Sequence, residues 1–212
     1  LFEWQLFNAS GVGMGLEGTS YLYNNPLECR GGVTRNAWYE IPCCPSNISR
    51  IWADLGDYVY SIDEDNLRVH QYLNSGIIIQ EIGPVMVKTN TKYPWDGTIR
   101  LEIEPKDPTE FILQLRIPSW SEGFKVLVNG REQETSRFHL AKSSYEQTAS
   151  GYDPRNSAFF EISREWVSGD VVELILDYEI RAWSAHPKVK GHEGKVAISE
   201  GPIMYCLESM DN

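Results

Sequence analysis

The sequence predicts a mainly β fold, a β-sandwich that is preceded by a short helical segment. From residue 66 onward, apolar and polar side chains alternate with the period of two that half-buried strands show. Apolar residues recur at helical spacing before that point, in residues 48–59. Turn signals at Asp96-Gly97, Gly169-Asp170 and Gly201-Pro202 interrupt the alternating part. Many short strands with such turns are typical of sandwiches rather than of parallel sheets with crossover helices.

The helical segment is expected to begin at Ser46 or Asn47, since either side chain can cap a first turn. Pro45 favours an extended or turn conformation for Cys44. The pair Cys43-Cys44 would therefore lie at the mouth of the helix, where free N–H groups and the helix dipole stabilise an anionic sulfur. The apolar stripe of this helix is formed by Ile48, Ile51, Trp52, Leu55 and Val59.

The strands are expected where the alternation is clearest. Asn129-Gly130, directly after one of them, is the strongest hairpin signal in the chain. Residues 131–157 are polar and are predicted to form an inserted loop. Composition changes near residue 62, which divides the chain into residues 1–62 and a β-sandwich domain of residues 63–212. The expected strands are residues 67–73, 99–103, 111–117, 125–128, 159–162, 171–176 and 195–198.

Charge and length exclude several classes of protein. The chain has 212 residues and a net charge of −11, which disfavours nucleic acid and anionic membranes as partners. It holds no apolar run of the length that crosses a membrane. Four cysteines are too few for a disulfide-based fold of this size. The start at Leu1, without an initiator Met or a signal segment, suggests a piece of a longer polypeptide.

The pair of cysteines in Pro42-Cys43-Cys44-Pro45 is the clearest chemical signal. Two neighbouring sulfurs can face one point if a metal holds them there, and zinc keeps thiolates charged at neutral pH. The alternative is a pair of inert, buried cysteines. The surrounding residues favour thiolate chemistry, which suits a reducing or metal-replete compartment such as the bacterial cytoplasm or periplasm.

Several other residues are expected to have structural roles. His70 lies in a strand pattern, and Asp63-Glu64-Asp65 is expected to be a solvated turn. Cys206 lies in an apolar stretch and is expected to pack as a small hydrophobic residue. Exposed aromatic residues near turns can stack on sugar rings, but burial in the core is expected for Trp95, Trp120 and Trp166.

Several segments together resemble the β-L-arabinofuranosidases of glycoside hydrolase family 127 and its relatives, and they cover nearly the whole chain in the family's order. The resemblance is carried by residues 23–28 (Tyr-Asn-Asn-Pro-Leu-Glu), Trp38, residues 43–50 (Cys-Cys-Pro-Ser-Asn-Ile-Ser-Arg), residues 93–97 (Tyr-Pro-Trp-Asp-Gly), residues 115–120 (Leu-Arg-Ile-Pro-Ser-Trp), residues 128–130 (Val-Asn-Gly), residues 164–170 (Arg-Glu-Trp-Val-Ser-Gly-Asp), residues 194–197 (Gly-Lys-Val-Ala) and residues 200–205 (Glu-Gly-Pro-Ile-Met-Tyr).

This resemblance implies a retaining glycosidase built from an (α/α)6 barrel followed by β-sandwich domains, of which residues 1–62 would be the barrel's end. It implies zinc held by three cysteines and a glutamate. By motif, Cys43 would be nucleophile and zinc ligand, Cys44 a second zinc ligand, and Tyr23 part of the sugar pocket. The other ligands and the acid/base glutamate lie upstream in the family, in helices that this chain lacks. Cys29 and Glu40 are the nearby residues that could substitute.

The resemblance therefore favours the C-terminal part of a hydrolase acting on an arabinose-containing oligosaccharide or glycan, which is inactive without an N-terminal barrel in cis or as a separate chain. A second hypothesis is a non-catalytic β-sandwich module for carbohydrate binding or assembly. A third is a metal-binding or redox module centred on Cys43-Cys44.

Overall fold

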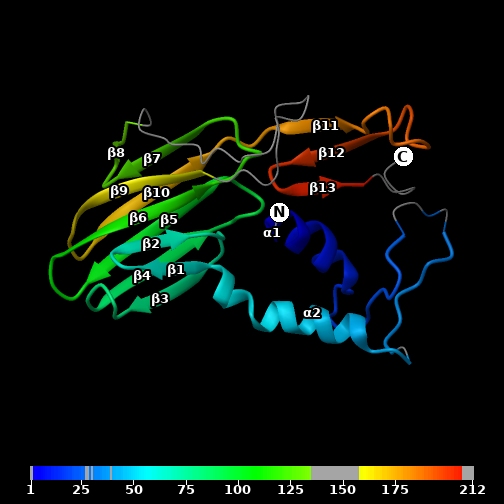
Figure 1. Ribbon diagram of the computed structural model, residues 1–212, viewed down its shortest axis with the longest axis horizontal. Coiled ribbons are helices and arrows are strands. Elements are labelled where there is room, and N and C mark those ends of the chain that lie inside the picture. The colour runs from blue at the N-terminus through cyan, green and yellow to red at the C-terminus, as the bar shows by residue number, and fades with distance from the viewer. Residues whose placement is uncertain (1, 27–28, 30, 39, 135–157, 207–212) are drawn as a thin grey trace. The chain divides into compact units, whose positions relative to one another are not determined.

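The computed structural model describes residues 2–26, 29, 31–38, 40–134 and 158–206. The chain divides into two compact units, Leu1–Asp57 and Tyr58–Asn212. The predicted mainly β chain, with a short helical segment before the sheets, is confirmed (Figure 1). No helix among the described residues is both long and apolar enough to cross a membrane.

The first unit contains short helices and extended segments. An α-helix, α1 (Phe2–Gln5), continues into a π turn (Leu6–Ser10) and a 3-10 turn (Gly11–Gly13). Tyr21 then pairs with two other segments through isolated bridges to Met14 and Asn36. The main helix is α2 (Cys43–Ala53), and a 3-10 turn (Leu55–Tyr58) follows it.

Helix α2 begins three residues before the predicted start and ends earlier than predicted. Pro42 occupies the N-cap position, so Cys43 and Cys44 form the first turn instead of preceding the helix. Pro45 is tolerated there because the first N–H groups of a helix have no carbonyl partner within it. Cys44 is therefore helical, against the tendency of a residue before proline. At the other end, Val59 lies beyond the helix and is buried in the second unit.

The second unit holds three sheets. The strand order is β1-β2-β6-β9 in the four-stranded sheet and β3-β4-β5-β10-β7-β8 in the six-stranded sheet, and β11-β12-β13 forms a small third sheet. All pairs are antiparallel except β2 with β6. The strands are β1 (Tyr60–Asp63), β2 (Asn66–Val69), β3 (Ser75–Ile79), β4 (Val85–Thr91), β5 (Thr98–Pro105), β6 (Thr109–Ile117), β7 (Phe124–Val128), β8 (Arg131–Glu132), β9 (Ala158–Trp166), β10 (Asp170–Leu176), β11 (Ile180–Ser184), β12 (Val196–Glu200) and β13 (Ile203–Tyr205).

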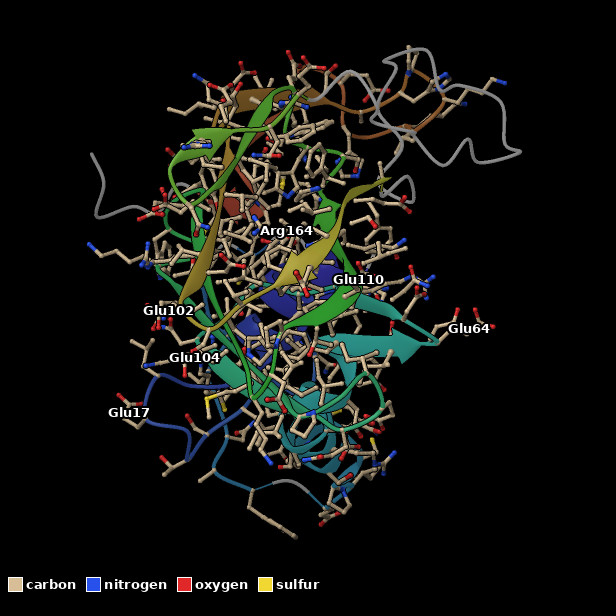
Figure 2. The ribbon with its side chains drawn as sticks, turned by 90° about the vertical axis from the view of Figure 1, so that its left-hand side faces the viewer. Glu17, Glu64, Glu102, Glu104, Glu110 and Arg164 are labelled. Atoms are coloured by element: carbon tan, nitrogen blue, oxygen red, sulfur yellow. The ribbon has the colours of Figure 1, made fainter. Side chains whose placement is uncertain are left out.

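The core lies between the two larger sheets, which are stacked face to face (Figure 1). Alternate residues of the central strands point inward, as Leu113 and Leu115 of β6 and Leu101 and Ile103 of β5 do, and these four side chains are fully buried. In contrast to these buried residues, Glu64 is exposed at the tip of the β1–β2 hairpin (Figure 2). It has a φ of 53°, and its neighbours Asp63 and Asp65 are exposed. The predicted solvated turn is confirmed.

Several strands differ from expectation. Strand β2 ends at Val69, earlier than the predicted residue 73, and β1, β3, β4, β11 and β13 were not predicted. The Asn129-Gly130 turn is confirmed, with φ values of 51° and 74° that suit a tight hairpin between β7 and β8. Part of the predicted loop of residues 131–157 is instead strand β8, and residues 135–157 lie outside the described residues.

Two burial predictions are wrong. Trp120 and Trp166 are buried, 3% and 0% exposed, but Trp95 is 72% exposed because it projects from the turn between β4 and β5. Cys206 is also exposed, since β13 ends at Tyr205, and it does not pack as a hydrophobic residue.

Candidate functional site

The site is built at the start of helix α2. Cys43 is exposed and Cys44 is half-buried, and both are free thiols. Their Sγ atoms lie 3.8 Å apart. The first turn is tied down by Asn47 and Ser46, whose side chains donate hydrogen bonds of 2.7 Å and 3.1 Å to the carbonyl oxygen of Cys43. The two sulfurs are therefore held together at the positive end of the helix dipole.

The geometry of the pair suits one tetrahedral metal ion. A tetrahedral zinc ion that binds two thiolates at about 2.3 Å holds their sulfurs about 3.8 Å apart. The Sγ atoms of Cys43 and Cys44 have this separation. Desolvation raises the pKa of the Cys44 thiol above its ordinary value, and the hydrogen bond and charge of Cys43 raise it further. Without a cation, the pair therefore resists carrying two negative charges.

Among the described residues, the cysteine pair stands without further metal-ligating side chains. The part of the chain that the structure describes contains no group of three or more His, Cys, Asp or Glu side chains that is arranged to hold a metal ion. Cys29 instead interacts with the backbone of Gly31, at 3.2 Å and 3.3 Å, and Glu40 is exposed. The structure therefore places neither Cys29 nor Glu40 in a metal-holding group with the cysteine pair.

Tyr23 is brought close to the cysteine pair through its backbone. The Cys44 thiol lies 3.9 Å from the Tyr23 carbonyl oxygen, as a weak donor. Tyr23 also lines an open cavity of about 500 Å³ together with Asn24, Asn25, Thr34 and Asn36. These amide and hydroxyl groups are neutral hydrogen-bonding partners of the kind that sugar hydroxyls need. The cysteines themselves are not among the lining residues.

Sequence reasoning missed Asn36 and Thr34. They reach the cavity because Asn36 exchanges backbone hydrogen bonds of 2.9 Å in both directions with Tyr21, which aligns their two segments. A single bridge of this kind leaves no periodic pattern in the sequence. Arg35, between them, is directed elsewhere, since its Nη1 atom donates to the carbonyl oxygen of Val12 at 2.8 Å.

Comparison with known proteins adds a family relationship. Residues 66–178 match the model of the middle domain of GH127 β-L-arabinofuranosidases, and residues 180–212 match the C-terminal domain of glycoside hydrolase family 127. The chain is 28% identical, over 231 residues, to the non-reducing end β-L-arabinofuranosidase of Bifidobacterium longum subsp. longum. That alignment covers 100% of this chain and 32% of the relative.

Solved structures agree with this relationship. This chain is 35% identical in sequence to a GH127 β-L-arabinofuranosidase from Geobacillus stearothermophilus T6, and its structure matches that crystal structure with a TM-score of 0.80. The match covers 99% of this chain and 32% of the other. A second solved structure, of a GH127 β-arabinofuranosidase, is 33% identical in sequence to this chain and matches it with a TM-score of 0.82. This match covers 99% of this chain and 33% of the other. The chain thus spans about a third of the length of these relatives.

Proposed function

Since this chain belongs to the β-L-arabinofuranosidases of glycoside hydrolase family 127, we propose that it is the nucleophile-bearing part of a retaining glycosidase. The enzyme would release L-arabinofuranose from an oligosaccharide or glycan. The observation that carries this proposal is the pair of sulfurs, 3.8 Å apart in the first turn of α2. The family is one of glycoside hydrolases, and the activity of this chain within it is the step that we propose.

In the proposed reaction, Cys43 is the nucleophile because its thiol is the exposed member of the pair. Its Sγ atom attacks the anomeric carbon, the glycosidic C–O bond breaks, and the leaving oxygen takes a proton from a carboxylic acid. Water then gives a proton to the resulting carboxylate and attacks the same carbon, so that the C–S bond breaks and Cys43 leaves as a thiolate. The net stereochemistry is retained because two displacements occur. Neutral groups around Tyr23 would hold the sugar hydroxyls.

Zinc is the cofactor that suits this pair, with Cys43 and Cys44 as two of its ligands. When bound, it would keep the thiols ionised and fixed in position. The remaining two ligands and the acid/base carboxyl would come from an N-terminal barrel, in cis or as a separate chain. We therefore propose that the 212-residue chain alone binds zinc weakly, since two ligands seldom hold it.

The test is elemental analysis of zinc together with hydrolysis of an aryl β-L-arabinofuranoside. The isolated chain is expected to hold zinc far below one equivalent and to show no turnover. A version that includes the barrel is expected to hold one equivalent, which is lost in Cys43→Ser and kept in the matched control Cys206→Ser. Turnover by the isolated chain, or full zinc in the Cys43→Ser version with the barrel, would contradict the proposal.

A further inference from the structure

We propose that the turn carrying Trp95, between strands β4 and β5, is a second contact site for the glycan, formed by an exposed indole. It lies in the second unit, whereas the cysteine pair lies in the first. Trp95 is 72% exposed, while Trp120 and Trp166 of the same unit are buried. An indole this exposed can stack against a ligand.

The backbone beneath Trp95 is fixed by hydrogen bonds. The Trp95 N–H donates to the carbonyl oxygen of Lys92 at 2.9 Å, and the Thr98 N–H donates to the Asp96 carboxylate at 2.8 Å. The Tyr178 hydroxyl donates to the carbonyl oxygen of Pro94 at 3.0 Å. These hydrogen bonds order the backbone of the turn before any ligand binds. The backbone entropy that is lost on binding is therefore reduced.

A packed aromatic layer supports the turn from below. The rings of Tyr93, Trp120 and Tyr178 contact one another, with centroids 4.9–6.4 Å apart. Gly97 lies against the next strand, where an added Cβ would overlap the carbonyl oxygen of Leu176. These contacts fill the space beneath the backbone of the turn.

The surroundings of Trp95 favour a sugar over a protein. Lys92 and Thr98 are exposed and Asp96 is partly exposed, so a single apolar ring is bordered by polar groups. A protein partner is usually bound by a larger apolar core. A sugar ring offers an apolar C–H face and a rim of hydroxyls, which match an indole bordered by hydrogen-bonding groups. The net charge of −11 argues against stacking with the bases of a nucleic acid.

The choice of sugar rests on the proposed function, because an enzyme that trims a glycan gains from a second hold on that polymer. We therefore assign an arabinofuranose-rich polysaccharide as the ligand class. A second contact on the same polymer raises the local concentration of its chain ends.

The experiment is native gel electrophoresis of the 212-residue chain in gels with soluble arabinan or with dextran. The chain migrates at neutral pH because its net charge is −11, and arabinan is expected to retard it while dextran is not. Trp95→Ala is expected to weaken the apparent affinity about tenfold, and Trp95→Phe is expected to restore part of it. Thermal unfolding by circular dichroism checks that each variant is folded.

The matched control is Trp38→Ala, since Trp38 is 71% exposed and lies in the other unit. It is expected to be retarded like the wild type. Cys43→Ser is also expected to be retarded, so this site can be tested even if the proposed hydrolysis fails. No retardation of the wild type by arabinan, equal retardation by dextran, or an unchanged Trp95→Ala variant would each overturn the proposal.

Discussion

At the scale of single residues, His70 shows how one side chain couples two strands of the sandwich. Its Nε2 atom lies 2.7 Å from the hydroxyl oxygen of Ser61, and its ring packs in a T-shaped arrangement with Phe159, with ring centroids 5.5 Å apart. Arg116 donates from Nε to the His70 carbonyl oxygen. Desolvation lowers the pKa of His70, and the positive charges of Arg116 and Arg68 lower it further. These contacts agree with the structural role predicted for this histidine.

The lowered pKa of His70 predicts a loss of stability in acid. As pH falls through the ordinary histidine range, the unfolded chain takes up this proton before the folded chain does, so the free energy of unfolding decreases. The contribution of His70 to the free energy of unfolding is fully present at pH values above its pKa in the unfolded chain. It decreases as the pH falls toward the lower pKa of His70 in the folded chain. Urea unfolding at pH 7.5 and pH 5.5 is expected to show a smaller decrease for His70→Gln than for the wild type.

The control for this pH effect is His186→Gln, because His186 is exposed. Its decrease between the two pH values should equal that of the wild type. An equal decrease in His70→Gln would show that His70 does not contribute to the pH dependence.

At the scale of elements, hydrogen bonds from two turns hold strand β10 in place. The Asn129 side chain of the β7–β8 turn donates to Asp170 at 2.7 Å and accepts from the Val171 N–H at 2.8 Å, so it joins this turn to strand β10. The turn at Gly97 also contacts this strand, because the Leu176 N–H donates to the Gly97 carbonyl oxygen at 2.9 Å.

Gly97→Ala is therefore expected to destabilise the sandwich. Its Cβ would meet the Leu176 carbonyl oxygen and the Tyr178 ring. Leu176 is held in strand β10, and Tyr178 is held by its ring contacts and its hydrogen bond to Pro94. Overpacking of this kind costs about 1–3 kcal/mol, measured as the change in the free energy of unfolding in denaturant. Gly76→Ala in β3 is the matched control, since the nearest atom to its Cβ is 3.9 Å away, and it should change stability by less than about 0.5 kcal/mol. Equal effects of the two changes would contradict the packing argument.

At the scale of the whole molecule, the two units have unequal cores. Among the described residues, the buried apolar side chains before residue 58 are Leu6 and Tyr21, and the others lie in the second unit. Apolar burial is the main source of folding free energy. The second unit therefore has a core that can support folding alone, whereas the described residues of the first unit provide no comparable core.

A chain of residues 58–212 is expected to fold without the first unit. It should unfold cooperatively, within a few degrees of the corresponding transition of the full chain, because its core is unchanged. Near-ultraviolet circular dichroism and thermal unfolding measure this. The reciprocal piece, residues 1–57, should show no cooperative transition. An expanded, dye-binding state for residues 58–212 would mean that its core needs the first unit.

The sequence alone determined the fold class, because strand alternation and Asn-Gly turn chemistry act over a few residues, as at Phe111–Ile117 and Asn129-Gly130. It also determined the family, and with it the importance of Cys43 and Cys44. The tertiary structure decided that these cysteines form the first turn of α2, with sulfurs 3.8 Å apart, and that Trp95 points to solvent while Trp166 is buried. Local pattern does not encode these outcomes, because exposure and the distance between side chains depend on which distant segments fill the space around each residue.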